Sequence, residues 1–186
     1  MELLLGIFTA FGLSASAGLN AYIPLLVVAL LARFTNLISL NPPWDTLESW
    51  WIIAFLGVLS LVEFFADKIP AVNHLNDLLQ TVIRPAAGAI VFAASANVIT
   101  NINPVFALAL GLVVAGGVHA VKSVAIRPMV TATTAGTGNI VVSFVEDIVS
   151  TVVSLISVLL PAFLLVLLAL SLVWLSLRRS RSRRAV

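Results

Sequence analysis

Long apolar stretches limit what this chain can fold into more strongly than any other feature of its sequence. Six can be marked, and the last two run together with only Pro161 between them. Hydrophobic residues make up 61% of the 186 positions, charged residues make up 10%, and the mean hydropathy is +1.14. A soluble domain is far less apolar, so we expect lipid to be the solvent. The stretches cover residues 3–32, 50–66, 85–100, 104–125, 139–159 and 161–177.

The bilayer then decides the fold class. Its hydrocarbon core is about 30 Å thick and needs roughly 20 apolar residues per helix, and an open sheet cannot satisfy its backbone groups there. We therefore predict an all-α fold, a polytopic transmembrane helical bundle of about six helices. Five helices are the alternative, because no polar turn separates the last two stretches at Pro161. We expect one transmembrane domain over residues 1–177 and a basic, disordered cytoplasmic tail over residues 178–186.

The few basic residues predict an orientation. Five arginines lie in the last nine residues, and they alone make the net charge positive. If the chain crosses six times and this tail is cytoplasmic, both termini are cytoplasmic and every basic residue except Arg33 lies on that side, as the positive-inside rule expects. Because Glu2 stands where a signal peptide carries basic residues, we interpret the start as a retained first helix. We expect an integral protein of the bacterial cytoplasmic membrane that contacts the lipid bilayer and no nucleic acid.

Two carboxylates at the end of the second stretch are the sharpest chemical feature. Glu63 and Asp67 lie four residues apart, on one face of a helix, and Lys68 follows directly. Carboxylates near lipid are costly unless they are paired, hydrated or protonated. Either this pair carries a proton or holds a cation, or Asp67 and Lys68 are simply solvated at a helix end. Both interpretations stay open.

The next segment, residues 71–83, has apolar residues at helical spacing opposite polar ones. This pattern predicts an amphipathic helix that lies on the membrane or re-enters it. We expect His74, Asp77 and Arg84 to form a polar cluster at the membrane surface, and Pro85 to begin a new helix. His74 and Asp77 alone are a weak pattern for a metal site, and the chain has no cysteine. We predict neither a metal nor a cofactor.

The fourth stretch places Gly111, Ala115, His119 and Lys122 on one helix face. Small residues allow close helix contact, within the chain or in a homo-oligomer. His119 and Lys122 then point into the bundle, where the Lys122 ammonium needs an acidic partner. Alternatively, the Lys122 side chain extends to the membrane surface. The acidic candidates are Glu63, Asp67, Glu146 and Asp147.

A small, uncharged polar segment precedes a periodic polar pattern. Residues 131–139 are rich in Thr, Ala and Gly, which suits either an ordinary turn or a backbone that lines a cavity. Polar residues then recur every three or four positions and predict a stripe along one helix. Serines at this spacing favour helix packing, whereas an acidic residue among them favours a hydrated path or an ion site. The stripe contains Asn139, Ser143, Glu146, Ser150, Ser154 and Ser157.

Three short sequence echoes raise the question of an internal repeat. Residues 83–85 (IRP) return as residues 126–128, and residues 60–63 (SLVE) return as residues 143–146 (SFVE). The third pairs SAGLN with TAGTGN. The three offsets disagree, so one duplication does not explain them, and chance matches in an apolar chain are the alternative.

Three segments carry a resemblance to a known family: SAGLNAYIPLL at 16–26, VEFFADKIPAVNHLNDLLQTVIRPAAGAI at 62–90 and TAGTGN at 134–139. The chain resembles the bacterial and plastid membrane proteins of domain-of-unknown-function family 4126, over nearly its whole length except the arginine tail. This resemblance implies a small polytopic membrane protein. It implies no activity, so it assigns no catalytic residue.

The polar residues predict a small transporter or channel for a small solute or ion, coupled to protons through a carboxylate. The alternatives are a membrane scaffold or assembly factor, in which these residues only hold helices together, and an enzyme that acts on a lipid through a metal or an acid–base carboxylate cluster. The candidate ion, proton or substrate path contains Glu63, Asp67, Lys68, His119, Lys122, Asn139, Ser143, Glu146 and Asp147.

Overall fold

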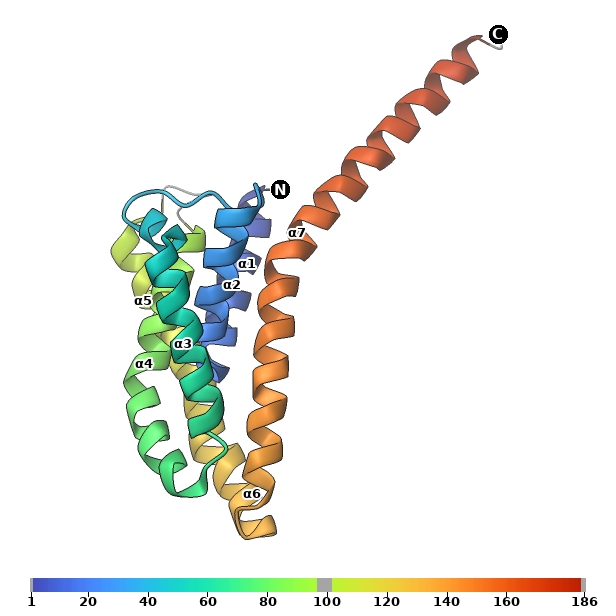
Figure 1. Ribbon diagram of the computed structural model, residues 1–186. Helices are drawn as coiled ribbons and strands as arrows, with labels where there is room; N and C mark the ends of the chain where they lie inside the picture. Colours follow the sequence, from blue (N-terminus) through green and yellow to red (C-terminus); the bar gives the residue numbers. More distant parts are fainter. Residues whose placement is uncertain (1, 97–101, 185–186) are drawn as a thin grey trace.

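The chain is a bundle of helices, as the sequence predicts (Figure 1). The computed structural model describes residues 2–96 and 102–184, and no strand occurs within these ranges. Two short irregular turns interrupt the α-helices: a 3₁₀ turn, η1, and a π-helical turn, η2. The elements are α1 (Glu2–Leu19), α2 (Tyr22–Phe34), η1 (Trp44–Glu48), α3 (Trp50–Ala66), α4 (Pro70–Ala96), α5 (Pro104–Val121), η2 (Lys122–Ile126), α6 (Arg127–Thr134) and α7 (Gly138–Arg184).

The outer surface and the helix lengths make this an integral membrane protein. Large apolar side chains point outward, including Trp51, Val82 and Val105, while charged side chains are buried. This is the reverse of a water-soluble fold, and it is what a lipid solvent favours. Three segments are long and apolar enough to cross a membrane, namely Asn76–Ala96, Pro104–Thr134 and Gly138–Pro161, and shorter apolar helices are Leu5–Leu19, Tyr22–Phe34 and Trp50–Ala66.

The first apolar stretch is a hairpin of two helices, α1 and α2, and not one crossing. The chain turns at Asn20, whose Oδ1 accepts hydrogen bonds from the backbone N–H groups of Tyr22 and Ile23 at 3.1 Å each. This Asn cap satisfies donors at the start of α2 that have no partner within the helix. The closed end of the hairpin lies inside the bundle, while the α6 end extends beyond it (Figure 1).

The hairpin corrects part of the predicted orientation. Because α1 and α2 run down and back, the N-terminus lies at the opposite end of the bundle from the turn between α3 and α4 (Figure 1). The sequence predicted both on one side, since it counted the first stretch as a crossing. A turn in an apolar environment leaves backbone N–H groups without partners, and the buried side-chain amide of Asn20 accepts hydrogen bonds from two of them.

The amphipathic segment at 71–83 is confirmed as helix, and its described polar face points inward. Gln80 and Arg84 are buried, whereas Leu78, Leu79 and Val82 are exposed. A helix with this arrangement presents apolar side chains to lipid and keeps its polar groups for partners within the bundle.

Pro85 does not begin a new helix, contrary to prediction. It lies inside α4, which continues unbroken from Pro70 to Ala96. Proline within a helix costs about 3 kcal/mol. The ion pairs of the preceding Arg84 and the packing of α4 against α1 and α5 offset that cost.

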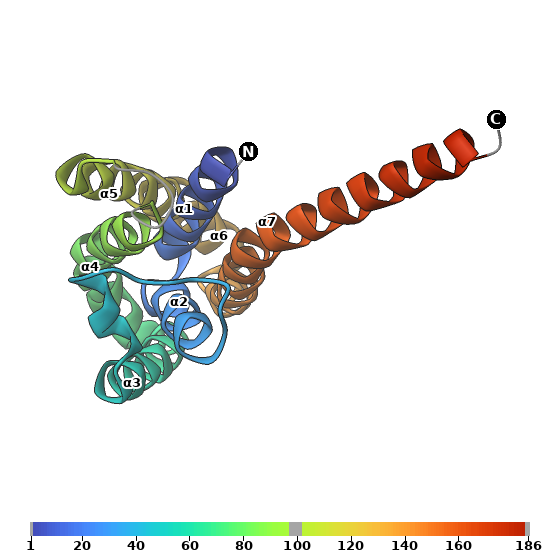
Figure 2. The same ribbon diagram turned by 90° about the horizontal axis from the view of Figure 1, so that it is seen from above.

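Pro161 also leaves its helix continuous, so the last two apolar stretches belong to one helix, α7. Helix α7 has 47 residues, which at 1.5 Å per residue is about 70 Å, more than twice the thickness of a hydrocarbon core. Its first half packs on the bundle, and its second half bends away from it (Figures 1 and 2). The neighbouring residues are apolar helix formers, with no glycine or polar group to end the helix, so proline can bend it without stopping it.

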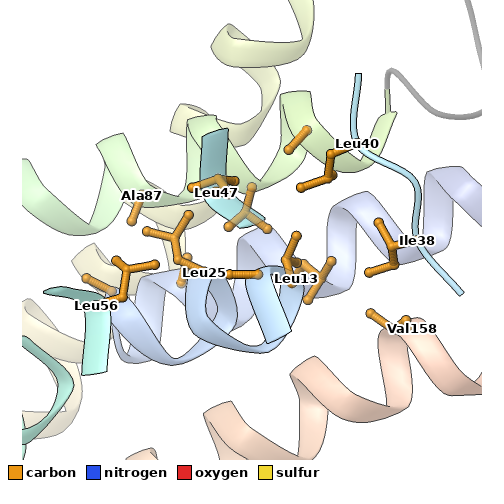
Figure 3. Close-up of a cluster of buried hydrophobic side chains, with 14 of the residues drawn as sticks. Leu13, Leu25, Ile38, Leu40, Leu47, Leu56, Ala87 and Val158 are labelled. Atoms are coloured by element: carbon orange, nitrogen blue, oxygen red, sulfur yellow. The ribbon is translucent and has the colours of Figure 1, made fainter. Parts of the chain in front are cut away.

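Small side chains dominate the interior. One buried cluster joins Leu13 of α1, Leu25 of α2, Leu56 of α3 and Val158 of α7 (Figure 3). A second consists mainly of alanines around Phe92. Lipid supplies little hydrophobic driving force between helices, so close packing must hold them together, and small residues permit it.

Helices α4 and α5 approach each other closely at Gly111. A Cβ atom at this position would meet the carbonyl oxygen of Gly88, and it would lie 2.7 Å from the Cα of Ala89 and 2.6 Å from the Cβ of Phe92. Two of these neighbours are backbone atoms that cannot move aside. Gly117, on the same helix, differs, because a Cβ atom added there would have no other atom within 4 Å.

We expect Gly111→Ala to lower the free energy of unfolding by about 1–3 kcal/mol, because the added methyl forces α4 and α5 apart. Gly117→Ala is the matched control and should leave stability unchanged or raise it by up to about 1 kcal/mol, because alanine favours helix. Thermal unfolding of both variants in detergent, followed by tryptophan fluorescence, measures the difference. Equal stability of the two variants would contradict the close contact at Gly111.

Candidate functional site

Charged side chains from five elements meet inside the bundle in what we call the charge network. They come from α3 and the turn after it, from α4, η2, α6 and α7. The most deeply buried are Arg84 and Glu63, whose side chains are both 0% exposed. The network consists of Glu63, Asp67, Lys68, Asp77, Arg84, Lys122, Arg127, Glu146 and Asp147.

Asp67, directly after α3, is the centre of the network. Its Oδ2 lies 3.5 Å from Nη2 of Arg84 and 3.3 Å from Nη2 of Arg127, and it accepts a hydrogen bond from the Ser143 hydroxyl at 3.2 Å. Its Oδ1 accepts one from the Asn76 amide at 2.6 Å. The donors to these two carboxylate oxygens therefore come from α4, α6 and α7.

The surroundings of Asp67 favour its charged form. Burial opposes ionisation, but the positive charges of Lys122, Arg84 and Arg127, together with the Asn76 hydrogen bond, outweigh it and hold the pKa of Asp67 below its ordinary value of 3.8. Asp67 lies in the turn between two helical spans, and it is a fixed negative charge at neutral pH.

One branch of the network runs from Asp67 to Thr81 through Arg84. Arg84 donates to Glu63 Oε1 from Nη2 at 2.9 Å and from Nε at 3.3 Å. Its Nη1 lies 3.3 Å from Nδ1 of His119, and the other ring nitrogen of His119 lies 3.2 Å from the hydroxyl of Thr81. The predicted inward direction of His119 is confirmed, because α5 turns it toward α4.

A second branch joins Lys122 and Arg127 to Glu146 of α7. Lys122 Nζ lies 2.7 Å from Glu146 Oε2, and Arg127 Nη2 lies 3.4 Å from the same oxygen. Arg127 also pairs with Asp77 through its Nη1 at 2.6 Å. Lys122 therefore has the acidic partner that the sequence required, and its side chain does not extend to the membrane surface.

The turn of the α1–α2 hairpin touches the network twice. Lys122 donates to the carbonyl oxygen of Leu19 at 3.3 Å, at the negative end of the α1 dipole. Asn20 donates through its amide to Asp147 Oδ1 at 3.0 Å, and the other oxygen of Asp147 pairs with Lys68 at 3.0 Å. The inward end of the hairpin therefore contacts the charge network through the Leu19 carbonyl and the Asn20 side chain.

A cavity of about 730 Å³ adjoins the charge network at the α6 end of the bundle. Its charged wall consists of Asp67, Lys68, Asp77 and Arg127, all members of the network. The end of α6 and the turn between α6 and α7 also line the cavity. Its lining there includes Thr131, Ala135, Gly136, Thr137 and Asn139.

The segment at 131–139 lines this cavity, although only part of it is irregular. Thr131 to Thr134 belong to α6, and the tight turn that follows uses left-handed backbone at Ala135 (φ 51°) and Gly136 (φ 89°). Asn139 closes the turn by donating its amide to the Thr131 hydroxyl at 2.8 Å. Hydroxyl-bearing residues of this segment therefore line the cavity, which is one of the two interpretations of its composition, and they do so from an exposed turn.

The polar stripe on α7 divides into two parts. Ser143, Glu146 and the adjacent Asp147 belong to the charge network. Ser150 and Ser154 are fully buried and bond Ser16 of α1, with Oγ–Oγ distances of 2.8 and 2.7 Å. The serines thus hold α1 against α7, and only the acidic end of the stripe reaches the cavity region.

Most of the predicted path residues meet here. Asp77 and Arg84, expected at the membrane surface, are also part of the network, because α4 turns its polar face inward. The side chain of His74 lies outside the described residues. Asn20 and Arg127 were not among the predicted site residues. The repeat of IRP at 126–128 was the available signal for Arg127.

Two of the sequence echoes occupy corresponding places in the network. Glu63 pairs with Arg84, and Glu146 pairs with Arg127. Both arginines approach the same oxygen, Oδ2 of Asp67. The SLVE and IRP elements therefore supply equivalent partners around one central carboxylate.

One protein family matches most of the chain. A model of the family described as Domain of unknown function (DUF4126) matches residues 7–181. The chain belongs to this family. The match includes every residue of the charge network and the cavity lining. No curated protein and no solved structure matches the chain. Within the described residues, no group of three or more His, Asp or Glu side chains is placed to hold a metal ion.

We expect Asp67→Asn to lower the free energy of unfolding by about 3–5 kcal/mol, because it leaves two buried arginines with one carboxylate fewer. Asp45→Asn, in exposed η1, is the control and should change stability by less than about 0.5 kcal/mol. Thermal unfolding in detergent compares them. A stable Asp67→Asn variant would show that Asp67 is not the centre of the network.

Acid should destabilise the wild-type fold through the same residue. Because the pKa of Asp67 is lower in the folded chain than in the unfolded chain, its contribution to stability is complete above about pH 4 and is lost as the pH falls through the lowered value. We expect the slope of unfolding temperature against pH below about pH 4 to be smaller in Asp67→Asn than in Asp45→Asn. Equal slopes in the two variants would contradict the pKa shift of Asp67.

Proposed function

We propose that this protein is a small transporter or channel for a small solute or ion, and that its transport is coupled to protons. One observation carries the proposal: the charged wall of the cavity is formed by residues of the buried charge network itself. A solute in the cavity would therefore alter the ion pairs that hold α3, α4, α6 and α7 together. Charged groups are kept within a membrane at high cost, and they commonly mark ion or substrate paths.

The α1–α2 hairpin is the second support. Broken helices whose ends meet polar groups within the bundle are a recurrent feature of transporters, because helix ends and free backbone groups can bind charge there. In this chain the C-terminal carbonyl of α1 and the Asn20 turn contact Lys122 and Asp147. A shift in these ion pairs would be passed directly to the hairpin. The polar path would then open or close as the hairpin moves.

We place the protein in the bacterial cytoplasmic membrane.

Proton movement in proteoliposomes tests the proposal. Purified protein is placed in liposomes that contain a pH-sensitive dye, and a potassium gradient with valinomycin sets the membrane potential. A panel of monovalent cations, organic ammonium ions, amino acids, small carboxylates and phosphate is then added one solute at a time. We expect wild-type liposomes to move protons faster than empty liposomes, either alone or with one of these solutes.

Three variants make the assay specific. Asp67→Asn should reduce the flux to that of empty liposomes, because it removes the central charge between network and cavity. Asn139→Leu, which leaves every ion pair in place, should reduce flux by filling the cavity mouth. Asp45→Asn should retain the wild-type rate. Wild-type flux equal to that of empty liposomes with every solute, or flux unaffected by both site variants, would refute the proposal.

A scaffold or assembly role is favoured by a different observation. The second half of α7 leaves the bundle, and its described side chains Phe163, Leu167 and Leu170 are exposed (Figure 2). Such a helix can pack against another membrane protein. Deleting residues 162–186 distinguishes the roles: a transporter should keep its flux, whereas a scaffold should lose a complex that mild detergent otherwise preserves.

A further inference from the structure

The charge network has one carboxylate more than it has cations. Among the side chains that the structure describes, five carboxylates face four basic groups. His119 does not restore the balance when it is neutral. A buried charge without a partner is costly, so the network needs one additional positive charge.

The partners of each carboxylate show where that charge can bind. Both oxygens of Asp67 and both oxygens of Asp147 accept hydrogen bonds or face cations. Glu146 has two cations at its Oε2. Glu63 differs, because Arg84 takes only Oε1 and its buried Oε2 has no partner. Asp77 also has one buried oxygen without a partner, but the rest of its side chain is 22% exposed and lines the cavity, so its charge is partly solvated.

The unpartnered oxygen of Glu63 suits a proton and little else. The Glu63 side chain is 0% exposed, so it has no contact with bulk water in this arrangement. A proton needs no additional space. The charged and titratable groups around Glu63 are Tyr22 from α2, Asp67 after α3, Arg84 from α4 and Lys122 from η2.

We propose that Glu63 is the proton-binding residue of this protein, and that its Oε2 holds one proton in the resting state. This inference rests on the proposed transport function and names the group that carries the coupled proton. Binding forms one O–H bond at Oε2, removes one negative charge and leaves five carboxyl groups with four negative charges against four cations. Release returns the proton to water and restores the excess negative charge.

The neighbouring groups are compatible with a neutral Glu63. Arg84 can still donate to Oε1, which becomes the carbonyl oxygen of the acid. Arg84 also faces Asp67, which keeps the opposite charge close to it. Gln80, one turn before Arg84 on the inward face of α4, has a buried Oε1 without a donor. Tyr22 of α2 lies near both residues, because it interacts with Gln80 and with the charge of Glu63.

Infrared spectroscopy tests the inference independently of transport. A protonated carboxylic acid has a C=O stretching band that a carboxylate lacks. We expect wild-type protein at neutral pH to show this band, and we expect the band to shift when the glutamate carboxyl carbons are labelled with ¹³C. Glu63→Gln should lose the band. Glu48→Gln should keep it, and so should Glu146→Asp, which leaves the number of carboxylates in the network unchanged.

The labelled wild-type protein keeps the test decisive even if Glu63→Gln does not fold. The chain contains only four glutamates, so a label-sensitive band that survives in Glu2→Gln, Glu48→Gln and Glu146→Asp is assigned to Glu63. Absence of a glutamate-sensitive band at neutral pH, or its survival in folded Glu63→Gln, would overturn the inference. If the band depends on Glu63 but no solute supports flux, the transport function fails and the proton site stands. If flux occurs without this band, the transport function stands and the proton site fails.

Discussion

Charge inside lipid must find its partner within the protein, and the rest of this structure depends on that constraint. A soluble protein can leave a lysine or an aspartate in water, but a helical bundle surrounded by hydrocarbon cannot. Here the basic and acidic groups of α3, α4, η2, α6 and α7 form one connected network around Asp67. The same network holds the inward end of the α1–α2 hairpin through Leu19 and Asn20.

Close helix packing makes these ion pairs possible. Gly88 and Gly111 bring α4 and α5 together, which places Arg84 of α4 within 3.3 Å of His119 on α5. Serine hydroxyls hold α1 against α7 in the same way, and so bring Asn20 to Asp147. The apolar interior and the charge network are therefore coupled. Looser packing between the helices would separate charged side chains of the network from their partners.

The network and the cavity share a wall, and the proposed transport function rests on this observation. Asp67, Asp77 and Arg127 stabilise the bundle and also face the cavity. The excess carboxylate and the unpartnered oxygen of Glu63 indicate a site that gains or loses a proton. A solute that competes for one of these cations would change the charge balance at all of them.

The sequence by itself determined the membrane environment, the helical fold class and most of the charged residues of the site. Hydropathy is a property of composition, and lipid leaves helices as the economical structure for such a chain. The periodic spacing of Glu63 with Asp67, and of His119 with Lys122, also predicted that each pair shares a helix face.

Only the tertiary structure decided which charges meet and where the chain turns. Arg84 and Arg127 are 43 positions apart and both approach Asp67 Oδ2, a geometry set by the packing of three helices. Pro85 predicted the start of a new helix, yet α4 continues through it, because packing and ion pairs outweigh the local preference of proline. Helix α7 continues through Pro161, because no neighbouring residue ends that helix. Asn20 made the turn inside an apolar stretch instead, since its buried amide finds partners in α2 and in Asp147 that no local pattern reveals.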